Sequence, residues 1–184
     1  VLLQGDRVLD ERPVSAHNPT VVITNPVSPA VWPAGSVQTV KWEGADEDED
    51  TLHYSVLYSR DGGTSWSLVA TGLAEKFYEA PVDAFAGSAE ARFRVVATDG
   101  INTGFAESAP VTIPNKIPVL TITNPNDGEA IVPGGLVVMQ GLAVDLEDGS
   151  LPDGALLWSS DRQGELGSGP SLPRNDLADG WHTI

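Results

Sequence analysis

The sequence contains no cysteine, one methionine and only three lysines among its 184 residues. Without cysteine, neither a disulfide framework nor a cysteine-ligated metal site can form. Basic side chains are scarce, because 10 Lys and Arg stand against 26 Asp and Glu and the formal net charge is −16. A surface of this sign repels phosphate backbones, so we expect no binding to nucleic acid.

Long apolar runs are missing as well. The run Ile131–Met139 is interrupted by Pro133 and two glycines and is too short to cross a bilayer, so we expect no direct insertion into a membrane. The hydrophobic fraction of 41% is nevertheless too high for a disordered acidic tail. The chain is therefore expected to bury a core.

An internal repeat is the strongest signal in the sequence. The segment Pro19–Pro26 recurs 99 residues later as Pro118–Pro125, and both copies end in Ile-Thr-Asn-Pro. The similarity continues through three further pairs of positions: Pro33 and Pro133, Asp46 and Asp145, Tyr58 and Trp158. A period near 100 residues is the size of one β-sandwich domain and is too long for one unit of a solenoid.

The pattern of apolar residues predicts strands. Three segments alternate apolar and polar residues with the two-residue period of half-buried strands, namely 37–42, 53–58 and 91–97. In the last of these, Phe93, Val95 and Ala97 would face a core, and Arg92 and Arg94 would face solvent. Glycine-rich turns separate the segments, and no stretch of a dozen residues has the 3.6-residue period of a helix. The sequence predicts an all-β protein.

The repeat also sets the expected domain boundaries. Residues 19–114 form one complete module, residues 115–117 form a linker, and residues 118–184 form a second module that lacks its final strands. Residues 1–18 are expected to be the trailing hairpin of a preceding module plus a linker. There is no start methionine and no basic leader region, so the chain is interpreted as a piece of a larger multimodular protein.

A sandwich without its closing strands exposes an edge and an apolar face. Two ways of covering them remain open from the sequence. The intact protein can supply the missing strands, or the hairpin at residues 1–14 of one copy can dock on the second module of another copy.

On these residues the first module resembles the fibronectin type III domains of bacterial secreted and surface proteins. Trp42 resembles that family's second-strand tryptophan, Tyr54 and Tyr58 resemble its third strand, and residues 92–99 resemble its sixth strand. Ala91 stands where the family usually carries a corner tyrosine, so the hydrogen bond of that tyrosine cannot form here.

The second module is similar to bacterial Ig-like repeats at residues 157–161, 166–169 and 179–182. Together the resemblances imply tandem Ig-like or fibronectin type III-like β-sandwiches, the second of them truncated. They also imply non-catalytic spacer, adhesion or protein-interaction modules in an extracellular or cell-surface protein. The expected partners are other protein modules, surface glycans and neighbouring modules of the same parent chain. The alternative is an accessory region of a secreted peptidase or glycoside hydrolase that binds carbohydrate or calcium.

Acidic residues concentrate in the loop after the second predicted strand of each module. Carboxylates are the oxygen ligands that Ca²⁺ prefers, but about six to eight oxygens must converge on the ion. Consecutive residues cannot supply them alone because alternate side chains diverge, so a residue from another loop would have to assist. A solvated loop that serves solubility is the alternative interpretation. The calcium hypothesis names Asp46, Asp48, Asp50, Asp99, Asp145, Glu147 and Asp148.

Two of the five tryptophans are candidates for stacking on a sugar ring. Trp42 and Trp158 lie in predicted core strands and Trp66 in a predicted hairpin, which leaves Trp32 and Trp181 as exposed platforms. A lone aromatic side chain can equally serve packing, and this alternative stays open for both residues.

Motifs for catalysis are not found. Residues 59–66 approximate the Asp-box pattern of sialidase propellers, but a single copy is typical of a hairpin turn and not of a propeller. The three histidines, His17, His53 and His182, have no partner at metal-ligand spacing. We therefore expect no enzymatic activity and no cofactor other than a calcium ion.

Overall fold

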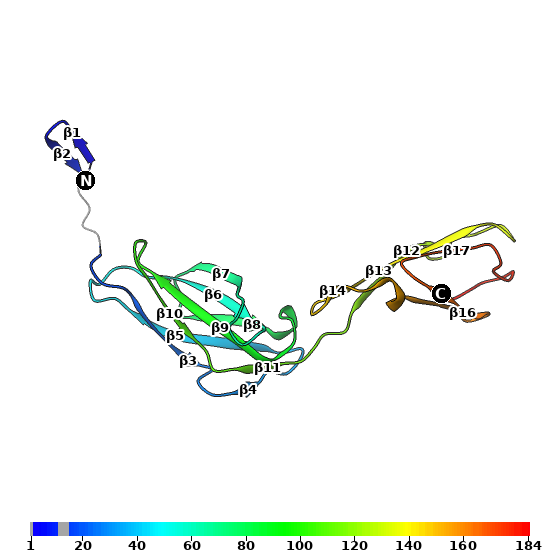
Figure 1. Ribbon diagram of the computed structural model, residues 1–184, viewed down its shortest axis with the longest axis horizontal. Helices are drawn as coiled ribbons and strands as arrows, with labels where there is room; N and C mark the ends of the chain where they lie inside the picture. The colour runs from blue at the N-terminus through cyan, green and yellow to red at the C-terminus, as the bar shows by residue number, and fades with distance from the viewer. Residues whose placement is uncertain (1, 11–14) are drawn as a thin grey trace. The chain divides into compact units, whose positions relative to one another are not determined.

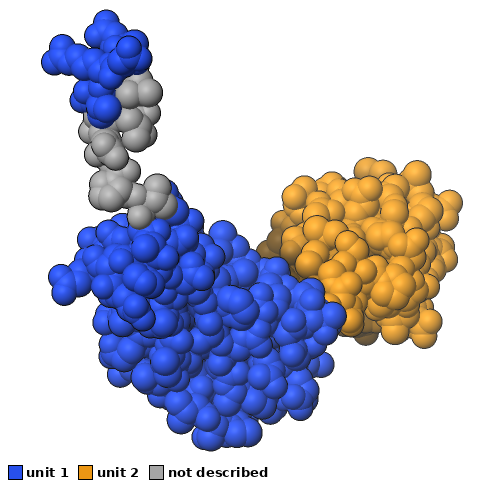
Figure 2. Space-filling model, turned by 60° about the vertical axis from the view of Figure 1, so that its left-hand side comes forward, with its two compact units in different colours: residues 1–115 blue, residues 116–184 orange. Residues whose placement is uncertain are grey.

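The computed structural model describes residues 2–10 and 15–184 and divides the chain into two compact units, Val1–Asn115 and Lys116–Ile184 (Figure 1, Figure 2). Strands account for all long regular elements in the described residues, which confirms the all-β prediction. None of the described helices has the length and apolar character needed to cross a lipid bilayer.

The chain begins with a two-stranded hairpin. Strand β1 (Leu2–Gln4) pairs antiparallel with β2 (Arg7–Asp10). Gly5 lies in the turn between them with a φ of 60°, a conformation that favours glycine. The remaining parts of the predicted hairpin, residue 1 and residues 11–14, lie outside the described residues.

Unit 1 contains two sheets. The first has the order β3 (Thr20–Asn25), β5 (Val37–Ala45), β8 (Phe77–Pro81). The second has the order β4 (Ala30–Val31), β11 (Val111–Ile113), β9 (Ser88–Thr98), β6 (His53–Ser59), β7 (Ser67–Leu73), and β10 (Thr103–Glu107) also pairs with β9. A short 3-10 helix, η1 (Val82–Ala84), connects β8 to β9.

The position of β7 defines the type of sandwich. In constant-type Ig domains strand D, which follows strand C, joins the sheet of strands A, B and E. The strands of unit 1 that correspond to A, B and C are β3, β5 and β6, so β7 is the strand to compare with D. Here β7 pairs with β6 in the second sheet. Unit 1 is therefore a fibronectin type III-like β-sandwich.

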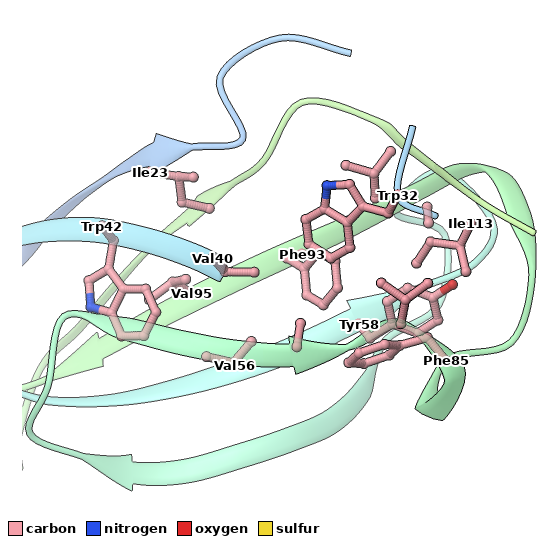
Figure 3. Packing of buried hydrophobic residues seen from close by; sticks show 14 of the residues in the cluster. Ile23, Trp32, Val40, Trp42, Val56, Tyr58, Phe85, Phe93, Val95 and Ile113 are labelled. Carbon is pink, nitrogen blue, oxygen red and sulfur yellow. The ribbon is translucent and has the colours of Figure 1, made fainter. Parts of the chain in front are cut away.

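Aromatic rings fill the space between the two sheets (Figure 3). Phe93 of β9 is fully buried, and its ring centroid lies 5.1 Å from Trp32, 5.3 Å from Phe85 and 5.4 Å from Tyr58. Val95 is buried on the same face of β9. The inward orientation predicted for this strand is confirmed, and the burial of these apolar side chains is the main source of stability.

Ala91 has no hydroxyl to hydrogen-bond to the backbone, but a tyrosine on another strand makes such a hydrogen bond. The hydroxyl of Tyr58 in β6 donates a hydrogen bond to the backbone carbonyl of Ala86, at 2.5 Å. Ala86 lies in the connection between β8 and β9. This connection is thus fixed from β6 in place of a corner tyrosine at position 91.

Unit 2 has fewer strands. In its larger sheet, β12 (Val119–Asn124) pairs with one edge of β13 (Val137–Asp145). The other edge of β13 pairs with β14 (Gly149–Ser150) and with β17 (Ser171–Arg174). A separate hairpin pairs β15 (Leu157–Ser160) with β16 (Gly164–Ser168), and η2 (Asp153–Ala155) precedes it.

The repeat is visible in the register of the first two strands of each unit. Ile23 lies opposite Trp42, and 99 residues later Ile122 lies opposite Gly141. The repeated asparagine has the same role in both units, because the side-chain amide of Asn25 donates to a carbonyl of β5 and that of Asn124 donates to a carbonyl of β13. Each asparagine precedes a cis proline.

The large buried indole ring comes from a different strand in each unit: Trp42 lies on β5 in unit 1, and Trp158 lies on β15 in unit 2. Gly141 occupies the position of Trp42, and a Cβ on Gly141 would lie 3.1 Å from the indole of Trp158. The ring that fills this space thus comes from β15, and its Nε1 donates to the carbonyl of Gly169 at 2.8 Å. Trp42 and Trp158 are both buried, as predicted.

Within residues 116–184 no described strand corresponds to β9, β10 or β11. Without these strands, equivalent side chains of β3 and β12 differ in exposure. Ile23 is 8% exposed, whereas Ile122 is 42% exposed. Unit 2 therefore presents core-type residues that unit 1 covers.

Candidate functional site

The acidic loop between β5 and β6 brings three carboxylates together. One oxygen each of Asp46, Asp48 and Asp50 lies within 4.8 Å of the others. Asp46 Oδ1 accepts the backbone N–H of Asp48 at 2.9 Å, an interaction that shapes the turn. Asp46 Oδ2 is shielded from solvent and has no hydrogen-bond donor.

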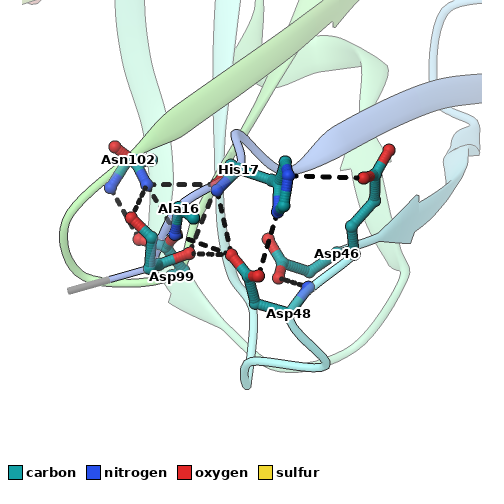
Figure 4. Close-up of polar contacts among 8 residues, drawn as sticks. Ala16, His17, Asp46, Asp48, Asp99 and Asn102 are labelled. Carbon is teal, nitrogen blue, oxygen red and sulfur yellow. Dashed lines mark hydrogen bonds and ion pairs between the residues drawn. The ribbon is translucent and has the colours of Figure 1, made fainter. Parts of the chain in front are cut away.

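Asp48 binds the segment that leads into unit 1 (Figure 4). Its Oδ2 accepts the backbone N–H of Ala16 at 2.8 Å and that of His17 at 2.9 Å, together with the hydroxyl of Ser15 at 2.9 Å. Its Oδ1 lies 2.9 Å from His17 Nδ1. One carboxylate thus satisfies the donors of three consecutive residues.

The carbonyls of the same segment are bound from the β9–β10 turn. The side-chain amide of Asn102 donates to the carbonyl of Ser15 at 3.1 Å and to that of His17 at 3.0 Å. Asp99 holds this turn, because its Oδ1 accepts the backbone N–H groups of Ile101 and Asn102, both at 2.6 Å. We refer to Asp48 and Asn102 together with residues 15–17 as the linker contact.

Charge reinforces the linker contact. The hydrogen bond from His17 lowers the pKa of Asp48, and the backbone N–H of His17 lowers it further. The same pair raises the pKa of His17, with Glu47 adding a smaller effect at 3.7 Å. The Asp48 interactions are therefore present above the ordinary pKa of an aspartate and are lost as pH falls through the lowered value. The charge on His17 is lost as pH rises through its raised pKa, while the backbone N–H donors remain.

Unit 2 repeats the arrangement with its own linker. Glu147 Oε1 accepts the backbone N–H of Lys116 at 3.1 Å. Asp145 Oδ1 accepts the N–H groups of Glu147 and Asp148, at 2.8 and 2.9 Å. Asp145, Glu147 and Lys116 lie 99 residues after Asp46, Asp48 and His17. In both units, an acidic side chain two residues after the turn aspartate binds the backbone that precedes the first strand.

The structure brings together three of the seven residues named for calcium. Asp46, Asp48 and Asp50 form the cluster, and no other group of three possible ligands is found among residues 4–9 and 15–184, whose side chains are described. Asp99 directs Oδ1 to its own turn. Asp145 ends β13, and Glu147 and Asp148 lie in the turn that follows it, but the three do not form such a group.

Sequence reasoning missed Ser15, His17 and Asn102. The sequence placed His17 in a linker without a partner at metal-ligand spacing and gave no sign that its side chain contacts Asp48, 31 positions later. The available signal was the spacing itself: an acidic residue stands two positions after both Asp46 and Asp145.

The two tryptophans predicted to stack on sugar differ in their exposure to solvent. Trp32 is 4% exposed and stacks on Phe93, so its ring faces are not accessible and the prediction is wrong for this residue. Trp181 is 82% exposed, and its role in ligand binding stays a prediction.

The Asp-box segment forms a hairpin turn, as predicted. Asp61 Oδ1 accepts the N–H of Ser65 at 2.8 Å and the hydroxyl of Ser59 at 2.7 Å. The hydrogen bond from the Ser65 hydroxyl is the main cause of the lowered pKa of Asp61. Gly63 has a φ of 101° and accepts the Nε1–H of Trp66 on its carbonyl, at 2.9 Å.

His182 has a partner that the sequence did not reveal. Its Nδ1 lies 2.7 Å from the hydroxyl of buried Ser160, and its Nε2 lies 2.6 Å from the carbonyl of Ala178. In the Ser-His-Asp triad an aspartate orients the second nitrogen of the histidine. Here a backbone carbonyl stands at that nitrogen, so the pair fixes the segment around residue 182 against β15.

No protein-family model matches the sequence, and no curated protein matches it. Among solved structures, the fibronectin(III)-like modules of Clostridium thermocellum CbhA share 17% identity, with a TM-score of 0.34 and coverage of 89% of this chain and 82% of that one. The N-terminal four Ig domains of Dscam1 isoform 1.9 share 14% identity, with a TM-score of 0.37. The chain matches 90% of its own length and 40% of that protein. The fold described above rests on strand order and pairing.

Proposed function

We propose that the chain is a spacer in an extracellular multimodular protein and that its acidic loops fix the linkers between modules. Fibronectin type III-like and Ig-like sandwiches serve protein interaction or spacing. A spacer differs from a flexible tether in that its linkers have a defined conformation. The acidic composition supports this role, because like-charged modules stay soluble and do not collapse on one another.

The observation that carries the proposal is the repeated contact between acidic loop and linker. Asp48 accepts the backbone N–H groups of Ala16 and His17, and Glu147 accepts the backbone N–H of Lys116. Every residue except proline carries a backbone N–H, so this contact depends little on the linker sequence and suits a device repeated in successive modules. Hydrogen bonds to a charged acceptor are stronger than those between neutral groups. Each module thereby holds the linker that precedes it.

Spin labels on the two units test this proposal. The chain has no cysteine, so Glu90→Cys and Asp153→Cys place one label on an exposed residue of each unit without further changes. Double electron–electron resonance should give a narrow distance distribution. Glu147→Ala should broaden that distribution, because the backbone of Lys116 loses its acceptor. Glu165→Ala is the matched control, an exposed glutamate of the same unit, and should leave the width unchanged. An equally broad distribution in all three proteins would contradict the proposal.

A calcium ion is the second candidate function, and one observation favours it. Asp46 Oδ2 is shielded from solvent without a donor, a costly state for a carboxylate oxygen that a bound cation would relieve. Asp46, Asp48 and Asp50 would hold the ion, and water would complete its coordination. The ion would supply positive charge to a loop in which Asp46 is followed by four further acidic residues, 47–50.

Isothermal titration calorimetry checks this candidate. We expect one Ca²⁺ per chain, with affinity at least about tenfold lower in Asp46→Asn and Asp50→Asn, since each substitution removes a charged ligand. Asp127→Asn makes the same change of charge at an exposed position in unit 2 and should not alter binding. No heat from Ca²⁺, with the same thermal unfolding in calcium and in chelator, would exclude the site and leave the linker contacts untouched.

A further inference from the structure

The outer face of the larger sheet in unit 2 has no charged side chain among its described residues. Residues 138, 140, 142 and 144 of β13 point away from the core, because the alternate residues from 137 to 145 are buried. The residues of β12, β14 and β17 that pair with these four lie on the same face. All of them are Val, Leu, Thr, Ser, Asn, Gln or Pro. We refer to this set of residues as the neutral face.

Apolar side chains in the middle of the neutral face are open to solvent. On β13, Leu142 is 57% exposed and Val144 is 45% exposed, and Val119 on β12, opposite Val144, is 69% exposed. The unit as a whole is strongly acidic, since residues 118–184 contain ten acidic and two basic side chains. An exposed apolar patch within a polar surface marks an interaction site.

The repeat shows that the neutral face belongs to unit 2 alone. Lys41 and Glu43 of β5 stand 99 residues before Gln140 and Leu142, and both are exposed. Unit 1 leaves this outer face open although its second sheet contains β9, β10 and β11, and Val22 there is 62% exposed. The exposure of the outer face is therefore independent of the strands in the opposite sheet. The two units differ in its charge.

Charge also selects the occupant of the neutral face. In unit 1, the outer face of the first sheet carries Lys41, Glu43 and Glu79. The outer face of the second sheet carries Arg94 and Glu107. Burying such groups against apolar side chains costs free energy, because they lose their water. Each chain has a formal net charge of −16, so two copies repel each other unless they meet through an uncharged surface.

The neutral face of a second copy meets this condition, because it brings no charge into the contact. We propose that two copies of the chain pair through unit 2, neutral face against neutral face. The contact is symmetric, since both copies offer the same surface, and it closes after two copies. Two sheets that pack in this way lie about 10 Å apart, with their side chains interdigitated.

The size of the neutral face sets the strength of the pairing. The six residues of β12 span about 20 Å, and three neighbouring strands span about 14 Å, so the face covers about 280 Å² of sheet. A standard protein interface buries about 800 Å² per partner. The pair is therefore expected to be a weak and reversible dimer.

Sedimentation velocity measures this association. Between about 10 μM and 1 mM protein, the average mass should rise from that of a monomer toward that of a dimer. Leu142→Asp should weaken the dimer at least about tenfold, because each copy would bury a carboxylate. Val132→Asp is the matched control, since Val132 is a 74% exposed residue of unit 2 outside its strands, and association should be unchanged. Raising NaCl from about 0.05 M to 0.5 M should strengthen the dimer, because salt screens the repulsion between acidic chains.

Paramagnetic relaxation in a mixed sample identifies the surface. Ser171 is exposed at the border of the neutral face, opposite Gln140, and Ser171→Cys introduces a single site for a nitroxide into a chain without cysteine. When this chain is mixed with a ¹⁵N-labelled unaltered chain, the broadened backbone N–H signals should centre on β12 and β13. Circular dichroism verifies that every variant is folded. A monomer at all concentrations, an equally stable dimer in Leu142→Asp, dissociation at high salt, or broadening centred on any other surface would overturn the proposal.

Discussion

Phe93→Ala should destabilise unit 1 by about 3–5 kcal/mol. The side chain is fully buried, and its ring contacts Trp32, Tyr58 and Phe85, which come from different segments of unit 1. Removing the ring forfeits its burial and leaves a cavity that these neighbours cannot fill without moving. A domain of this size has a total stability of about 5–15 kcal/mol, so a large part of it would be lost.

Urea unfolding followed by tryptophan fluorescence measures this loss, because Trp32 and Trp42 report on unit 1. Phe105→Ala is the control: this ring is 61% exposed and lies under the guanidinium of Arg94, 4.7 Å from its centroid. We expect a cost below about 1 kcal/mol there. Equal effects of the two substitutions would mean that the sheets do not pack through Phe93.

Gly104→Ala should cost about 1–3 kcal/mol, although it adds a single methyl group. A Cβ at this position would lie 1.9 Å from the carbonyl oxygen of Pro19, which is backbone and cannot move aside alone. The contact brings β10 against the start of β3, immediately after the linker contact. Relief of the clash therefore requires β3 or β10 to shift.

Gly154→Ala provides the matched control, because a Cβ there meets nothing within 4 Å. Thermal unfolding should show a lower midpoint for unit 1 in Gly104→Ala and little change for unit 2 in Gly154→Ala. If Gly104→Ala has no effect on stability, β3 and β10 do not approach each other as closely as described.

Local patterns were sufficient to predict much of the fold. Alternation in residues 91–97 predicted which side chains of β9 face the core, because strand geometry forces successive residues to opposite sides. The repeat of Ile-Thr-Asn-Pro predicted equivalent first strands, and the structure assigns a common role to Asn25 and Asn124. Both signals act within a strand or between neighbouring strands.

The failures involve contacts between residues far apart in the sequence. Trp32 follows a two-residue strand and gives no pattern of its own, and its burial depends on Phe93, 61 positions later. His17 lies in a segment without periodicity, and its partner Asp48 belongs to a loop whose acidic run resembled a solvated surface. The run of acidic residues pointed to this loop. It could not show that Asp48, and not Glu47 or Glu49 beside it, binds the linker.

The acidic loop therefore has a different role from that of a general negative surface. In unit 1, Asp48 accepts hydrogen bonds from the backbone N–H groups of the linker, and Asn102 donates to its carbonyls. In unit 2, Glu147 likewise accepts a backbone N–H of the linker. The side chains in question belong to loops at fixed positions on a rigid sandwich. Such loops are where functional contacts are usually found.

Hydrogen exchange at single backbone N–H groups tests the linker contact most directly. By NMR at neutral pH, the N–H groups of Ala16 and His17 should exchange more slowly than those of an unstructured peptide, because both donate to Asp48. Asp48→Ala should remove the protection, and Asp50→Ala, one position further along the same acidic run, should preserve it. Exchange of Ala16 and His17 at the unstructured rate in the unaltered protein would contradict the claim that the acidic loop fixes the linker.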